Sequence, residues 1–216
     1  MTVFWTIIEI LAMTFGVVYV VLEVRKSQSM WYFMIVASLL NILVYFHNHF
    51  AAMGLIQFYY IVSSIYGIRT WARVRKDAQQ QFSENEAAKA GKVEVRRLNP
   101  KRALISSAIA VAGFVALAIL FTRIVKVQPG DIPGKPIWDA AVAVLSMLAT
   151  YWLSQSWREQ WLIWMVVNVA AVVMFVYPFF HGGEGLLWMG LLYVIYIVSC
   201  IVGLRNWYFR SVIIEE

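Results

Sequence analysis

Seven stretches of about 20 mainly apolar residues run through this chain, with short polar breaks between them. One helical crossing of a hydrocarbon core about 30 Å thick needs about 20 such residues. The sequence therefore predicts an all-α membrane protein with seven transmembrane helices. A β-barrel is disfavoured, because its strands would be about ten residues long and would alternate in polarity. The helices are expected at residues 3–24, 30–48, 52–71, 102–122, 137–155, 160–180 and 185–207.

Composition supports a membrane location and excludes some kinds of site. Only 14% of the residues are charged, against about 25% in soluble domains. The first apolar stretch has no basic segment before it and no small-residue cleavage site after it, so we expect a retained helix rather than a signal peptide. Cys200 is the single cysteine, which excludes an intramolecular disulfide, and a small buried side chain is expected there. His47, His49 and His181 lack the spacing of a metal site, so no metal and no cofactor is predicted.

The basic residues predict the orientation in the membrane. Three of the eighteen Lys and Arg residues fall on the N-terminal side of the helices, namely Arg123, Lys126 and Lys135. The other fifteen fall on the opposite side, most of them in a charged loop at residues 72–101. Because basic residues in short loops stay in the cytoplasm, we expect the N-terminus outside and the C-terminus in the cytoplasm. The net charge of +6 then indicates contact with a lipid surface and no nucleic-acid partner.

An internal repeat relates the two halves of the chain. Residues 55–71 (LIQFYYIVSSIYGIRTW) and 191–207 (LLYVIYIVSCIVGLRNW) align at an offset of 136 with nine identities in seventeen positions. Weaker matches relate Glu9 to Asp139 and Trp31 to Trp161 at an offset of 130. Helices one to three should therefore correspond to helices five to seven. The identities outside the aliphatic residues are Tyr60/Tyr196, Ser63/Ser199, Gly67/Gly203, Arg69/Arg205 and Trp71/Trp207.

The odd number of helices in each repeat predicts how the repeats are joined. Two directly connected three-helix units would face opposite ways, so one linker helix is needed to make them parallel. We therefore expect a first repeat at 1–71, a cytoplasmic charged loop at 72–101, a linker helix at 102–126 and a second repeat with the C-terminal tail at 127–216. Parallel repeats related by an axis along the membrane normal are a transporter design, with the substrate site near the midplane between the halves. This 3+1+3 plan resembles that of the SWEET-type carriers.

Polar and aromatic residues recur at helical spacing, which places them on one face of each helix. An amide is costly to expose to lipid, so it turns towards a neighbouring helix or a water-filled cavity. Two interpretations stay open: these amides join helices through hydrogen bonds, or they contact a polar ligand. Trp161 and Trp164 lie beside Asn168 and are candidates for stacking on a ligand. The candidate binding residues are Asn41, Gln57, Tyr60, Trp161, Trp164, Asn168, Tyr193 and Tyr196.

The remaining aromatic and acidic residues have simpler explanations. Five tryptophans lie at predicted helix ends, where interfacial belts collect this residue type. Glu9 and Asp139 occupy matching places near the outer helix ends and could attract a cation, although a capping or hydrogen-bonding role explains them equally well. The tryptophans interpreted as interfacial anchors are Trp5, Trp71, Trp138, Trp157 and Trp207.

Two strings give the chain a resemblance to a known family. Residues 53–71 (MGLIQFYYIVSSIYGIRTW) contain a Gln, then an aromatic pair, and a Tyr-Gly dipeptide near their end. Residues 138–168 contain Asp-Ala, Trp-Leu and a Glu-x-Trp-x-x-Trp element before Asn168. In both strings the chain resembles the PnuC family of bacterial vitamin transporters. It departs from the family's pattern at residues 154–157 and 181–186, which puts the substrate in doubt more than the fold.

The resemblance implies facilitated diffusion of nicotinamide riboside through the bacterial inner membrane, with phosphorylation by a cytoplasmic kinase trapping the product. Related members carry thiamine or riboflavin instead, and relatives are expected to be homotrimers. Nicotinamide riboside and thiamine are both aromatic cations, which aromatic faces attract. The residues alone therefore do not separate these two substrates.

Other functions fit the sequence less well. A light-driven pump would need a lysine in the last helix for retinal, and residues 185–207 contain none. No Ser/His/Asp, Cys/His or metal-ligand cluster forms at reachable spacing, which disfavours a membrane enzyme. No Walker motif is present, so any use of ATP would belong to a partner. A signalling or structural membrane module remains as an alternative, and it would tolerate loss of the inward polar residues.

Overall fold

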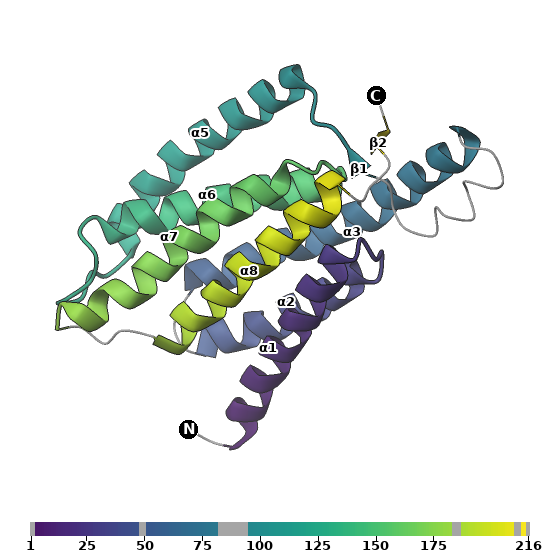
Figure 1. Cartoon of the computed structure of the whole chain (residues 1–216). Coiled ribbons are helices and arrows are strands. Elements are labelled where there is room, and N and C mark those ends of the chain that lie inside the picture. Colours follow the sequence, from purple (N-terminus) through teal and green to yellow (C-terminus); the bar gives the residue numbers. More distant parts are fainter. Residues whose placement is uncertain (1–2, 48–50, 82–94, 183–186, 210–212, 215–216) are drawn as a thin grey trace. The chain divides into compact units, whose positions relative to one another are not determined.

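The computed structural model describes residues 3–47, 51–81, 95–182, 187–209 and 213–214 (Figure 1). His49 and residues 82–94 of the predicted charged loop lie outside the described residues. The described part is helical apart from two short strands, β1 (Val95–Arg96) and β2 (Ile213–Ile214). The helices are α1 (Val3–Val24), α2 (Met30–His47), α3 (Ala51–Gln81), α5 (Pro100–Ile124), α6 (Lys135–Ser154), α7 (Gln160–Phe180) and α8 (Leu187–Phe209).

Six helices in the described part of the chain are long and apolar enough to cross a membrane. They are α1, α2, α5, α6, α7 and α8, so the prediction of a multi-pass helical membrane protein is confirmed. The remaining helix, α3, carries Gln57, Ser63 and Ser64 within its apolar part and a charged C-terminal end. A seventh crossing by α3 stays a prediction.

The third helix is longer than the sequence predicted. It was expected to end at Trp71, but α3 continues for ten more residues to Gln81. The added segment, ARVRKDAQQQ, contains no Gly or Pro and consists mainly of strong helix formers. The charges of this segment show that the chain becomes polar, but they do not end the helix. The first part of the predicted loop is therefore helical.

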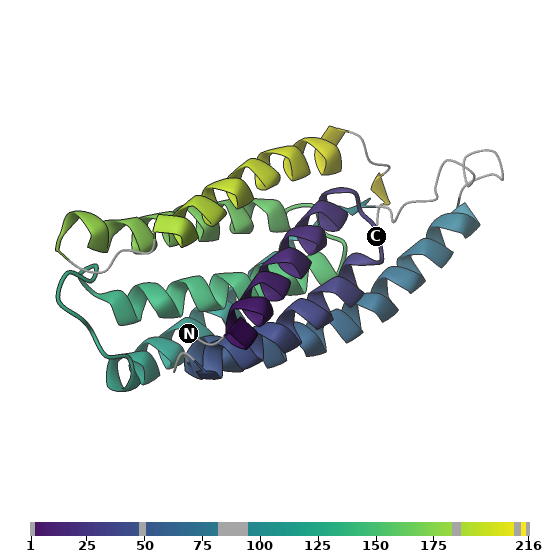
Figure 2. The same cartoon turned by 90° about the horizontal axis from the view of Figure 1, so that it is seen from below.

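The chain forms two compact units. Unit 1 comprises Met1–Arg97, Thr150–Arg158 and Arg205–Glu216, and unit 2 comprises Leu98–Ala149 and Glu159–Leu204. In unit 1, α1 packs against α2, and α2 packs against α3. Figures 1 and 2 show these three helices side by side. Their connections are short, which makes neighbours along the chain antiparallel neighbours in space.

Buried tryptophans hold unit 1 together around Trp71 of α3, ten residues before the end of that helix. The rings of Trp31 and Trp71 meet edge to face, with 5.6 Å between their centroids. The ring centroids of Trp71 and Trp207 lie 6.1 Å apart. The indole N–H of Trp71 donates to the carbonyl of Leu153 at 3.0 Å, and that of Trp207 donates to the carbonyl of Glu23 at 3.3 Å. Such partners are what a buried indole N–H needs. These side chains pack inside the protein.

The prediction of interfacial anchors is therefore wrong for three of the five tryptophans. Trp71, Trp157 and Trp207 are almost completely buried, whereas Trp138 is exposed. Trp5 is half-buried and its ring stacks on His47 at 3.7 Å. A position at a helix end says how deep in the membrane a side chain lies, but not whether it faces lipid or a neighbouring helix. The three buried rings face neighbouring helices.

A backbone junction joins three distant segments of unit 1. β1 pairs in parallel with β2, so that Val95 faces Ile213. On its other side, the N–H of Arg96 donates to the carbonyl of Ser156 at 2.9 Å, and the N–H of Arg158 donates to the carbonyl of Arg96 at 3.2 Å. The turn after α6 that enters this junction holds Ser156 at a φ of 61°, in the left-handed region.

In unit 2, local sequence signals explain where α5 begins. Asn99 is the N-cap of α5, and its side chain accepts a hydrogen bond from the N–H of Lys101 at 2.9 Å. Pro100 occupies the first turn, where its missing N–H costs nothing. The second half of the unit is organised around α7 and α8, which carry most of the predicted site residues.

Candidate substrate-binding site

The predicted site residues belong to both units. Asn41, Gln57 and Tyr60 lie on α2 and α3 in unit 1. The other five lie on α7 and α8 in unit 2, and they are Trp161, Trp164, Asn168, Tyr193 and Tyr196.

The polar stripe of α3 faces inward, as predicted. Gln57, Ser64 and Gly67 are buried, while residues on the opposite side, such as Leu55 and Val62, are exposed. Tyr60 is half-buried, and its ring meets that of the neighbouring Tyr59 at 6.1 Å. Asn41 on α2 is also half-buried. This face of α3 therefore turns polar groups towards the interior of the protein.

The corresponding stripe of α8 also faces inward. Cys200 and Gly203 are buried, and Tyr193 and Tyr196 are half-buried. The ring of Tyr193 stacks on Phe175 of α7 at 5.5 Å and meets Tyr196 edge to face at 5.7 Å. These contacts give α7 and α8 a shared aromatic wall. Such a wall suits a planar ring or a cation.

A tryptophan lies against a glycine at one place in each unit. In unit 1, a Cβ added to Gly67 would lie 2.4 Å from Cζ2 of Trp31. In unit 2, a Cβ added to Gly203 would lie 2.6 Å from the nearest ring atoms of Trp161. Only glycine therefore leaves room for these rings. Trp161 is 2% exposed, so this residue fills the space between α7 and α8 and presents little surface to a ligand.

Asn168 and Trp164 lie one helical turn apart on α7. The amide nitrogen Nδ2 of Asn168 donates to Sγ of Cys200 on α8 at 3.3 Å. The indole N–H of Trp164 is buried and has no hydrogen-bond partner within the described residues. Sequence reasoning expected Cys200 only as a small buried side chain and missed its contact with Asn168. The signal that could have found it is the alignment of Cys200 with Ser64 in the repeat.

Two acidic residues were predicted to attract a cation. Glu9 on α1 and Asp139 on α6 are both half-buried. The ion pair seen near Asp139 joins Asp131 and Lys135 at 2.9 Å, and Asp131 also accepts a hydrogen bond from the N–H of Gln128 at 2.7 Å. A structural role of the loop before α6 explains that pair. Attraction of a cation by Glu9 and Asp139 stays a prediction.

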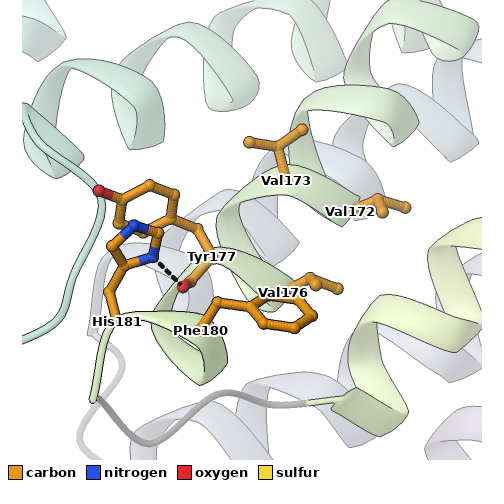
Figure 3. A pocket seen from close by; sticks show the side chains of 6 residues that line it. All are labelled: Val172, Val173, Val176, Tyr177, Phe180 and His181. Atoms are coloured by element: carbon orange, nitrogen blue, oxygen red, sulfur yellow. Dashed lines mark hydrogen bonds between the residues drawn. The ribbon is translucent and has the colours of Figure 1, made fainter.

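Two apolar grooves are lined by none of the predicted site residues. The first, of about 280 Å³, runs along the end of α7 beside Val176, Tyr177 and His181 (Figure 3). There, the His181 ring stacks on Tyr177 at 3.8 Å, and its Nδ1 lies 2.9 Å from the Tyr177 carbonyl. The second lies between α5 and α6 and is lined by Ala, Val, Leu and Phe. Neither offers the few well-placed polar groups that orient a small polar ligand.

No group of three or more His, Cys, Asp or Glu side chains in the described segments could hold a metal ion. The arrangement is therefore one of buried amides and aromatic rings on membrane helices. Such a set of groups can bind and release a polar aromatic molecule without chemical reaction. Comparison with known proteins identifies the family to which the chain belongs.

A sequence model described as "Nicotinamide mononucleotide transporter" matches residues 6–209, which is nearly the whole chain. The chain belongs to this family of membrane transporters. Membership agrees with the resemblance to the PnuC family and with the six candidate spans. It also disfavours an enzymatic function, because the named relatives are transporters.

Relatives within the family differ in what their names say they carry. The nicotinamide riboside transporter PnuC of Escherichia coli is 25% identical over 93% of this chain and 84% of its own length. The riboflavin/roseoflavin transporter RibM of Streptomyces davaonensis is 26% identical over 91% of this chain and 82% of its own. The crystal structure of the vitamin B3 transporter PnuC aligns with a TM-score of 0.66 and 20% identity, over 96% of this chain and 92% of that one. This structural match shows the fold alone.

Proposed function

We propose that this chain carries nicotinamide riboside across the bacterial inner membrane by facilitated diffusion. The observation that carries the proposal is the family match over residues 6–209, together with the nicotinamide riboside transporter aligned over 93% of the chain. The residues on α7 and α8 support it. Aromatic rings stack on a pyridinium ring and attract its positive charge, while amides supply donors and acceptors for its carboxamide and ribose.

The 3+1+3 arrangement and the orientation belong to the same proposal. In it, residues 1–71 and 127–216 form two parallel repeats, residues 102–126 form the linker helix, and residues 72–101 lie in the cytoplasm. The Trp31–Gly67 and Trp161–Gly203 contacts support a repeat, because the same unusual packing occurs at matching sequence positions. The basic residues support a cytoplasmic C-terminus.

For the site, we propose that the substrate contacts the inward polar and aromatic residues of both repeats. Trp164 and Asn168 are the strongest members, because Trp164 has a buried N–H without a partner in the described part of the chain and Asn168 lies one turn away. Trp161 would act from behind them, by holding α7 against α8. The other proposed members are Asn41, Gln57, Tyr60, Tyr193 and Tyr196, with Glu9 and Asp139 attracting the cation before it binds.

Thiamine and riboflavin are the alternative substrates. Riboflavin is favoured by the RibM relative, whose identity to this chain matches that of the nicotinamide riboside transporter. Thiamine, like nicotinamide riboside, is an aromatic cation. In either case a cytoplasmic kinase would trap the product, and assembly as a homotrimer in the bilayer is expected from the resemblance.

Uptake into proteoliposomes tests the proposal directly. Purified protein is reconstituted, and entry of labelled nicotinamide riboside, nicotinamide mononucleotide, thiamine, riboflavin and a hexose is compared with entry into empty vesicles. We expect saturable entry of the riboside and none of the hexose or the nucleotide, whose phosphate adds negative charge. If riboflavin or thiamine alone enters, the proposed substrate is wrong, but the proposal that the protein is a carrier is kept. If none enters faster than into empty vesicles, the proposed function fails.

A further inference from the structure

The contact between Asn168 and Cys200 joins α7 to α8 in the interior of unit 2. The amide nitrogen Nδ2 of Asn168 lies 3.3 Å from Sγ of Cys200, within hydrogen-bonding range for sulfur. Asn168 is 4% exposed and Cys200 is 2% exposed. Both groups are therefore shielded from lipid and from bulk water.

In this contact the amide of Asn168 turns its nitrogen towards α8. An asparagine amide has an acceptor on one side and donors on the other, and rotation by half a turn exchanges them. A sulfur atom that accepts the N–H of Asn168 holds the amide nitrogen towards α8. The carbonyl oxygen Oδ1 is then held on the other side of the group, where it can accept a hydrogen bond from a ligand.

Trp164 supplies the complementary group on the same face of α7. It lies four residues before Asn168, one turn of helix, and its buried indole N–H has no partner within the described residues. An N–H donor and a carbonyl acceptor on one helix face, a turn apart, match a ligand that carries both an acceptor and a donor. A primary carboxamide has both.

We propose that Cys200 is a positioning residue for the substrate. It accepts the Nδ2 hydrogen bond of Asn168 and so keeps Oδ1 of that residue turned towards an N–H or O–H group of the vitamin. This inference rests on the proposed function, because it requires that Asn168 touches the substrate. Cys200 itself does not touch the substrate.

A serine should be able to replace the cysteine in this role. In the aligned position of the first repeat, the hydroxyl of Ser64 donates to its own helix, at 2.7 Å from the carbonyl of Tyr60. A hydroxyl that donates in this way keeps its oxygen lone pairs for an incoming N–H. Alanine and valine offer no acceptor at all, and valine fills a volume close to that of cysteine.

The experiment measures uptake by proteoliposomes for the parent and for Cys200→Ala, Cys200→Val and Cys200→Ser. We expect Ala and Val to raise KM by about two- to tenfold, the effect of one lost hydrogen bond. The maximal rate per folded protein should stay within about twofold, and Ser should restore the parent KM. The matched control is Ser199→Ala, the neighbouring position, whose hydroxyl donates to Ile195 of its own helix at 3.1 Å.

The outcomes separate this inference from the proposed function. If the parent transports a vitamin and Cys200→Ala and Cys200→Val keep its KM, the inference is overturned while the transporter stands. A KM raised equally by Ala, Val and Ser also overturns it, because the acceptor would then be irrelevant. If valine restores the KM that alanine loses, cavity filling explains the effect and the inference fails. If the parent carries none of the vitamins, both proposals fail together.

Discussion

Alanine at Gly203 should destabilise the protein, although alanine is the better helix former. The Cβ of the new residue would lie 2.6 Å from three ring atoms of Trp161, where carbon atoms in good contact lie about 3.5 to 4.0 Å apart. The ring or the helix must therefore move by about 1 Å. Trp161 is buried between α7 and α8, so close packing leaves its rigid ring little room to do so.

The size of the effect follows from two opposing contributions. Overpacking a buried site costs about 1 to 3 kcal/mol, and an overlap with three atoms of a large ring belongs at the upper end. Replacing a helical glycine by alanine contributes about 1 kcal/mol in the opposite direction. The net loss should be about 2 kcal/mol, which corresponds to a fall in Tm of about 4 to 8 °C for a chain of this length.

Heating in detergent, followed by size-exclusion chromatography of the protein that remains folded, measures this change. Gly113→Ala on α5 is the matched control, because its Cβ would lie 4.0 Å from Cγ2 of Val144, an ordinary contact. That control should melt slightly above the parent. Trp161→Phe should recover part of the loss in the Gly203→Ala background, because phenylalanine lacks the second ring. If Gly203→Ala has the same Tm as Gly113→Ala, the packing argument is refuted.

Four further substitutions test other parts of the structure. Trp207→Ala should lower the free energy of unfolding by about 3 to 5 kcal/mol through loss of a buried ring, with Trp138→Ala as the exposed control in the same melting assay. Ser156→Gly should raise Tm by a few degrees, because it removes a left-handed φ and a buried hydroxyl that lacks a partner within the described residues; an unchanged or lower Tm would contradict this. Asn168→Ala and Trp164→Ala should each abolish the thermal shift that the vitamin causes, and a parent-like shift in both variants would refute the proposed site.

Hydropathy and helical periodicity were sufficient to predict the helices and most of their bounds. The bounds of α1 and α7 agree with the sequence prediction to the residue, and the other helix ends differ by a few residues, apart from the C-terminal end of α3. That helix continues into a charged segment. The hydropathy pattern missed this, because it locates the membrane boundary and carries no signal for the end of a helix. A helix former such as Ala72 or Lys76 belongs equally well to a helix outside the bilayer.

The inward faces of α3 and α8 were also predictable, because polar groups and glycines at i, i+3 and i+7 fall on one side of a helix. What sequence could not reveal is which neighbour each side chain meets. Trp71 and Trp207 have the positions of interfacial anchors, yet each donates its N–H to a backbone carbonyl within the protein. Cys200 has the size and low polarity of an ordinary buried side chain, yet its Sγ on α8 accepts a hydrogen bond from Asn168 on α7. These contacts depend on tertiary packing between segments distant in sequence.

Uptake of labelled nicotinamide riboside by proteoliposomes tests the central claim most directly. With the parent protein, entry should be saturable, should be competed by unlabelled riboside, and should fall to the level of empty vesicles for Asn168→Ala. Entry by the parent that does not exceed that of empty vesicles would contradict the account.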